Sequence, residues 1–115
     1  MAPVEYYPLI AALPRCPLPR YLLRCSVLLL WNDDAERLLP QIYAESVVSC
    51  GFSACCTLTP SSLDHGHTVL TVQREFPRLD GSIVLPQDIP LRECCDLTKE
   101  EQIMLAGLQL LRGEM

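Results

Sequence analysis

The chain has 115 residues, of which 50% are apolar and 20% are charged, and its formal net charge is -5. This length suits one domain and is too short for two, and the composition excludes a disordered chain. The nine basic residues are scattered. Because nucleic-acid binders and proteins held on anionic membranes concentrate basic residues on one surface, the charge pattern argues against both kinds of partner.

The first 20 residues are rich in proline and also in apolar side chains. Three of their five prolines, Pro14, Pro17 and Pro19, exclude a regular helix or a central strand over residues 14–20, and a short helix over residues 5–13 remains open. Tyr6 and Tyr7 are residues of the kind that anchor protein interfaces. We therefore predict that residues 1–20 form an arm that packs on the domain or on a partner, and that residues 21–115 form a single α+β domain.

Residues 21–31 are expected to form a strand, because apolar side chains recur at every second position from Leu23 to Trp31. The apolar run from Cys25 to Trp31 is far shorter than the roughly 20 residues that cross a bilayer. It also lies too deep in the chain for a secretory signal, and no small-residue cleavage site follows it. We therefore expect no membrane association.

A helix is predicted after residue 32. Asn32, Asp33 and Asp34 suit a helix start, since acidic groups there interact favourably with the helix dipole. Apolar residues then follow at helical spacing to Tyr43. Pro40 lies inside this pattern and should kink or divide the helix, which we expect to end at Gly51.

Two alternating runs, residues 52–59 and 68–76, flank a loop that is dense in turn-forming residues. This arrangement predicts an antiparallel hairpin. Asp80 and Gly81 indicate a turn, after which residues 82–85 could add a short third strand. Pro86 and Pro90 exclude a central strand in the connection that follows.

Residues 98–112 give the strongest prediction of a helix. Thr98 and Glu101 fit a capping box, and Gly113 ends the pattern. The helix is apolar over more than half of its circumference, whereas a helix on one sheet face needs only a stripe about 100° wide. The arm, a second copy or another protein must cover the apolar surface of the helix that the sheet does not bury. The candidate partner-binding residues are Tyr6, Tyr7, Met104, Leu108 and Leu111.

Together, these elements predict an α+β fold with the order strand, helix, strand, strand, short strand, helix. The expected core is a small antiparallel sheet of 3–4 strands with two main helices packed on one face.

Cysteine is unusually frequent, with seven residues. The odd number, without a secretory signal, predicts reduced thiols and a cytoplasmic or nuclear location. Zinc needs four nitrogen or sulfur ligands, but the sequence has no C-x-x-C motif, and adjacent cysteines on a strand point to opposite faces. We therefore expect no cofactor, and a zinc-stabilised binding module is the alternative. Its ligands would come from Cys55, Cys56, His65, His67, Cys94 and Cys95.

A thiol-dependent enzyme is the second alternative. It requires a cysteine held near a histidine and an orienting acid, and Asp64, His65 and the cysteines supply only the residue types. No glycine-rich phosphate loop is present. The favoured hypothesis is a small non-enzymatic subunit or adaptor of an intracellular complex, which binds another protein, forms a homodimer, or does both.

Overall fold

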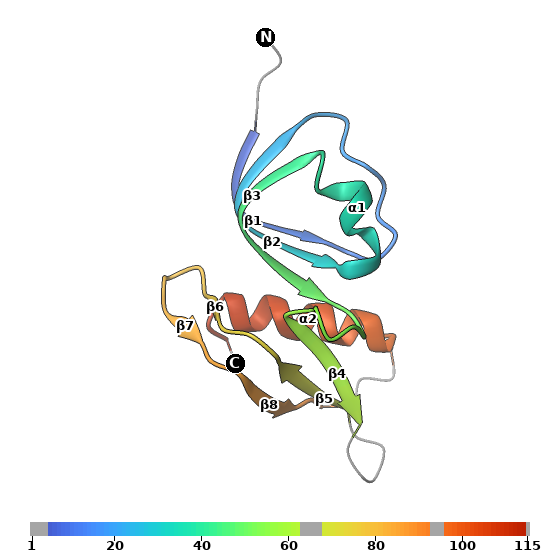
Figure 1. Ribbon diagram of the computed structural model, residues 1–115, viewed down its shortest axis with the longest axis vertical. Helices are drawn as coiled ribbons and strands as arrows, with labels where there is room; N and C mark the ends of the chain where they lie inside the picture. Colours follow the sequence, from blue (N-terminus) through green and yellow to red (C-terminus); the bar gives the residue numbers. More distant parts are fainter. Residues whose placement is uncertain (1–4, 63–67, 93–95, 115) are drawn as a thin grey trace.

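The computed structural model describes residues 5–62, 68–92 and 96–114, and its elements alternate strands with two helices (Figure 1). In chain order they are β1 (Glu5–Ala12), β2 (Leu23–Trp31), the 3₁₀ turn η1 (Asn32–Asp34), α1 (Ala35–Leu38), β3 (Ile42–Cys50), β4 (Leu58–Ser62), β5 (Thr68–Val72), β6 (Phe76–Pro77), β7 (Ile83–Val84), β8 (Gln87–Pro90) and α2 (Lys99–Leu111). None of the described helices is long and apolar enough to cross a membrane.

The fold is α+β, but the predicted sheet was wrong in both size and kind. The described strands form a six-stranded sheet in the order β1-β2-β3-β4-β5-β8 and a two-stranded sheet of β6 and β7. Strands β1 to β4 are mutually parallel, whereas β4, β5 and β8 are antiparallel neighbours. The two helices also do not share one face, because they contribute to separate apolar clusters.

The largest error concerns residues 35–50, where the expected helix stops after a single turn. The α1 helix ends at Leu38, and the chain enters β3 at Ile42. Pro40 has no N–H to donate and its ring obstructs the preceding turn, so the helix cannot continue. The residues that follow include Ile42, Tyr43, Val47 and Val48, which fit a pleated strand well.

The N-terminal segment contains an element that was not predicted, and residues 5–12 do not form the short helix left open there. They are strand β1, which pairs in parallel with β2 from Glu5 opposite Leu23 to Ala12 opposite Leu30. Pro8 is tolerated because β1 lies at the edge of the sheet.

The hairpin and the last helix follow the sequence pattern more closely. Strands β4 and β5 pair antiparallel, with Leu58 opposite Val72, although residues 52–57 are not in a strand. The capping box of α2 is confirmed: the Glu101 N–H donates to the Thr98 side chain, and the Thr98 N–H donates to the Glu101 carboxylate, both at 3.1 Å. Gly113 follows the helix with a φ of +74°.

The first apolar cluster lies between α2 and the sheet. Its buried members include Leu29, Val48, Leu58, Ile103 and Leu110. Gly107 allows the helix to approach the sheet closely: a Cβ there would lie 2.9 Å from Leu58 Cδ1 and 3.1 Å from Leu29 Cδ1. The absence of a side chain at this position therefore sets how closely α2 packs.

The second cluster lies beneath the connection between β1 and β2, which packs against α1. Its buried members include Cys25, Leu28, Leu30 and Leu38. Asp34 links this connection to α1. Its carboxylate accepts a hydrogen bond from the Arg15 N–H at 2.9 Å and forms an ion pair with the Arg37 guanidinium at 3.0 Å. Arg37 in turn donates to the Cys16 carbonyl at 2.7 Å.

The three parallel strands β1, β2 and β3 keep their direction, but part way along each strand turns over, so that the side chains exchange faces of the sheet. Residues Tyr7, Cys25 and Ala44 share one row of the ladder and Leu9, Val27 and Ser46 share another, yet no pair joins Pro8, Ser26 and Glu45 between them, although all three are described. The side chains of β2 in the second cluster change from Leu23 and Cys25 to Leu28 and Leu30 across this row. Figure 1 shows the three strands curving around α1.

Hydrogen bonds on β3 independently indicate the reversal. The Gln41 carbonyl faces β2, where it accepts the Leu23 N–H, whereas the Gly51 N–H faces β4, where it donates to the Leu58 carbonyl. Positions an even number of residues apart point the same way in an uninterrupted strand. The strand must therefore turn over once between these two residues.

We predict that Gly107→Ala destabilises the protein. Alanine favours the helix by about 0.8–1.0 kcal/mol, but crowding in a packed core costs about 1–3 kcal/mol, so urea unfolding should show a net loss of about 1 kcal/mol. In a Leu58→Ala background, which removes the closest atom, the same substitution should become neutral or stabilising. A stabilised single variant would contradict the close approach.

We predict that Asp34→Asn lowers the free energy of unfolding by about 2 kcal/mol, because it leaves the partly buried Arg37 without its counter-ion. Asp33→Asn is the matched control, since that neighbouring carboxylate is exposed, and it should change stability by no more than about 0.5 kcal/mol. Equal effects of the two substitutions in urea unfolding would refute the role given to Asp34.

Candidate functional site

The most distinctive surface of the protein is the edge of β3. This strand pairs with β2 over nearly its whole length, but its contact with β4 is limited to Cys50 opposite Leu58. Within the described ranges, residues 42–48 therefore have no strand on their second side. An unpaired edge presents backbone N–H and C=O groups that can pair with another chain.

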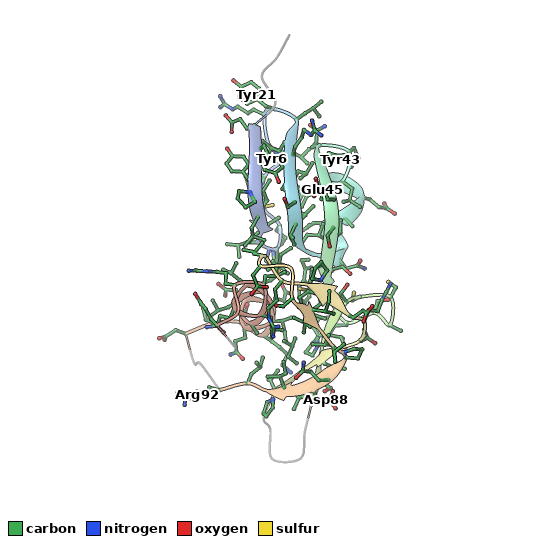
Figure 2. The ribbon with its side chains drawn as sticks, turned by 90° about the vertical axis from the view of Figure 1, so that its left-hand side faces the viewer. Tyr6, Tyr21, Tyr43, Glu45, Asp88 and Arg92 are labelled. Carbon is green, nitrogen blue, oxygen red and sulfur yellow. The ribbon has the colours of Figure 1, made fainter. Side chains whose placement is uncertain are left out.

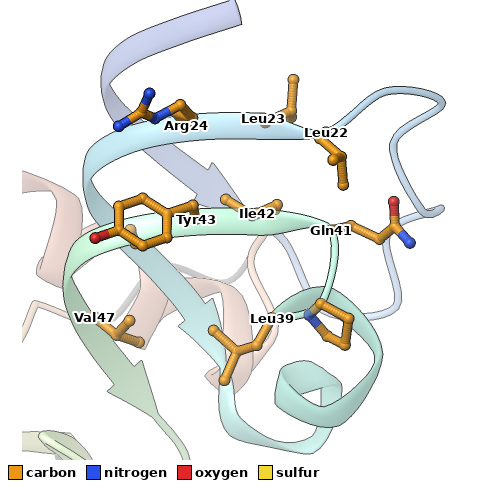
Figure 3. Close-up of a pocket in the computed structure, with 10 residues that line it drawn as sticks. Leu22, Leu23, Arg24, Leu39, Gln41, Ile42, Tyr43 and Val47 are labelled. Atoms are coloured by element: carbon orange, nitrogen blue, oxygen red, sulfur yellow. The ribbon is translucent and has the colours of Figure 1, made fainter. Parts of the chain in front are cut away.

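A pocket of about 480 Å³ opens beside this edge, between the start of β2, the turn after α1 and β3 (Figure 3). Leu22, Leu39, Tyr43 and Val47 supply much of its wall and are all exposed, Tyr43 to 64%. The pocket residues are Leu22, Leu23, Arg24, Leu39, Pro40, Gln41, Ile42, Tyr43, Ala44 and Val47.

Charged and aromatic groups border the apolar hollow. Arg24 lies on the strand next to Tyr43, with its guanidinium carbon 5.5 Å from the centre of the tyrosine ring, a cation–π arrangement. Glu45 is exposed two residues further along β3, on the same end of the molecule as Tyr6 and Tyr43 (Figure 2). Among the described residues, neither Arg24 nor Glu45 has an ion-pair partner.

The candidate partner-binding residues are divided between surface and core. Tyr6 and Tyr7 are exposed on β1, where their hydroxyls bond to Ser26 and Glu5. Met104 and Leu111 are buried at 2% and 0% exposure in the first cluster, and Leu108 is partly buried against it. The surplus apolar surface of α2 is thus largely covered by the domain itself, because the sheet is larger than predicted.

Ala11 and Leu13, at the end of β1, share a smaller hollow of about 190 Å³ with Met104, Leu105 and Leu108 on α2. The N-terminal segment therefore contributes to covering the helix, as one of the three expected coverings. Whether a partner also contacts this face stays a prediction.

The proposed zinc ligands are only partly described. His65, His67, Cys94 and Cys95 lie outside the described residues. Cys55 is exposed and Cys56 is buried. Within the described ranges, no group of three or more histidine, cysteine, aspartate or glutamate side chains comes together as a metal site. The zinc alternative therefore stays a prediction.

The described cysteines are free, and the surroundings of three of them favour the neutral thiol. Burial raises the pKa of Cys50 far above its ordinary value, and the nearby Cys56 adds to the shift. Burial is also the main cause of the raised pKa values of Cys25 and Cys56. A nucleophilic cysteine needs the opposite shift. Asp64 and His65 lie outside the described residues, so a thiol enzyme remains untested.

Comparison of the chain with models of protein families, with curated proteins and with solved structures found no match.

Sequence reasoning missed the β3 edge and its pocket. Tyr43 was assigned to the apolar stripe of a helix, which would have buried a side chain that is 64% exposed in the structure and lines the pocket. The available signal was Pro40 followed by a residue pattern rich in β-branched and aromatic side chains.

We predict that Cys55 is alkylated about tenfold or more faster than Cys25, Cys50 and Cys56 in the folded protein, because only the first is exposed. The reaction with a limiting maleimide at neutral pH should be followed by peptide mass spectrometry. In concentrated urea the four rates should converge. Rapid labelling of Cys50 in the folded protein would contradict the placement of its thiol.

Proposed function

We propose that the protein is a small protein-binding subunit that takes up part of another polypeptide chain along the open edge of β3. The observation that carries this proposal is the coincidence of an unpaired strand edge with an exposed apolar pocket along residues 42–47. Addition of a strand to such an edge gives affinity through backbone hydrogen bonds, while an adjacent pocket selects side chains.

The other edges of the sheet support the choice of β3. Natural sheets protect exposed edges with prolines and charges. Strand β1 has Pro8 and Glu5, and β8 has Pro90 and Asp88. Residues 42–48 contain no proline and only one charged residue, Glu45. An edge that lacks this protection and borders apolar surface is best explained as a surface that is covered in the assembled state.

We further propose that the protein acts in a reducing compartment, the cytoplasm or the nucleus. The five described cysteines are free, and three of them are buried as neutral thiols. Such thiols behave as small apolar core residues and need no oxidising surroundings.

Site-specific crosslinking tests the proposal. With benzoylphenylalanine in place of Val47, irradiation of cells that express the full chain should give covalent protein adducts. The same probe at Gln87, exposed on the protected edge of β8, is the matched control and should give few. Adducts should also diminish when Tyr43→Ala removes part of the pocket wall.

Circular dichroism should first establish that the probe variants are folded. Equal adduct yields from the two positions, or none from either, would exclude β3 as the binding edge.

A further inference from the structure

We infer that the chain seated on the β3 edge is a second copy of the same protein, paired antiparallel about a two-fold axis. This inference rests on the proposed function and names its partner. Two identical strands that pair antiparallel are related by a two-fold axis, and such an interface must be complementary to itself.

The charges at the edge meet this requirement. One exposed cation, Arg24, and one exposed anion, Glu45, lie beside the β3 edge. Within the described chain, neither is in an ion pair. A partner segment of one charge sign would leave one of the two facing a like charge or no charge. A second copy rotated by half a turn brings each group towards its opposite.

The backbone allows this pairing at the start of β3. The Gln41 carbonyl points to β2, so by strand alternation the N–H and C=O of Ile42 and Ala44 point to the free edge. The reversal near Glu45 ends this run. The pairing is therefore short. The charges select the register in which Ala44 lies opposite Ala44 of the second copy, where these two residues exchange both hydrogen bonds and Ile42 remains unpaired.

With Ala44 opposite Ala44 of the second copy, Tyr43 lies opposite Glu45 of that copy. Residues directly opposite each other on one face of an antiparallel pair have Cβ atoms about 4.5–5.5 Å apart. Arg24 lies beside Tyr43 and can extend past the ring to the same carboxylate. The exposed side chains of Leu39 and Val47 then lie along the interface between the two copies.

The net charge of -5 per chain opposes self-association at long range. At physiological salt this repulsion is screened beyond about 8 Å, whereas contacts at the interface are shorter. The expected dimer is accordingly weak and depends on protein concentration.

Charge reversal tests the inference, with sedimentation equilibrium of the full chain over a dilution series as the measurement. Arg24→Glu and Glu45→Arg should each raise the dimer Kd by about tenfold or more. Each substitution gives residues 24 and 45 the same charge, and the two-fold axis repeats that repulsive contact at a second place in the interface. The double variant should recover the original Kd. Arg92→Glu and Glu75→Arg, exposed and away from the pocket, are the matched controls and should leave the Kd unchanged.

A measurement without substitution covers the case in which a variant fails to fold. Amide hydrogen exchange at Ala44 should slow as the protein concentration rises, while exchange at β8 should not change. A monomer at all concentrations, a dimer indifferent to both reversals, or a double variant that does not recover would each overturn the second-copy inference. If the Val47 probe still crosslinks to a different protein, the proposed function stands; if it crosslinks to nothing, both fail.

Discussion

The reversal of the three parallel strands at Pro8, Ser26 and Glu45 is the constraint on which the rest of the structure depends. Because the strands turn over there, both halves of β2 contribute side chains to the cluster at α1, and its second half also contributes Val27, Leu29 and Trp31 to the cluster under α2. One short chain thereby fills two apolar clusters. Strand β4 begins at Leu58, opposite the last residue of β3, so residues 42–48 lie before its start and their edge stays open beside the pocket.

The elements predicted correctly are those specified by local signals. The capping box at Thr98 and the strand over residues 23–31 depend on residues close in sequence, and both are confirmed, although the single apolar face expected along β2 is divided between the two clusters. Strands β1 and β3 were missed because their partner is a distant parallel strand, and their outer faces are not simply apolar or polar. Parallel pairing cannot be recognised from a short turn motif in the sequence, because parallel strands are joined by a long crossover. This crossover can be helical or, as in residues 13–22, irregular.

The candidate site was less predictable than the fold. The apolar excess of α2 was recognised correctly, but its burial depends on how many strands face it, and six strands cover more than the three or four expected. Met104 and Leu111 were therefore assigned to an interface when they belong to the core. Conversely, Tyr43 and Val47 are exposed because they lie on a strand whose second side is unpaired, not in a helix packed on a sheet.

The close approach of Gly107 to Leu29 and Leu58 also affects how the chain can fold as it is made. The helix that covers the first cluster is the last described element to leave the ribosome. Until it emerges, β2, β3 and β4 have one apolar face exposed to water, and the open β3 edge lies beside that face. Nascent chains at this stage are substrates for chaperones, and any delay in synthesis between β8 and α2 would prolong their exposure to aggregation.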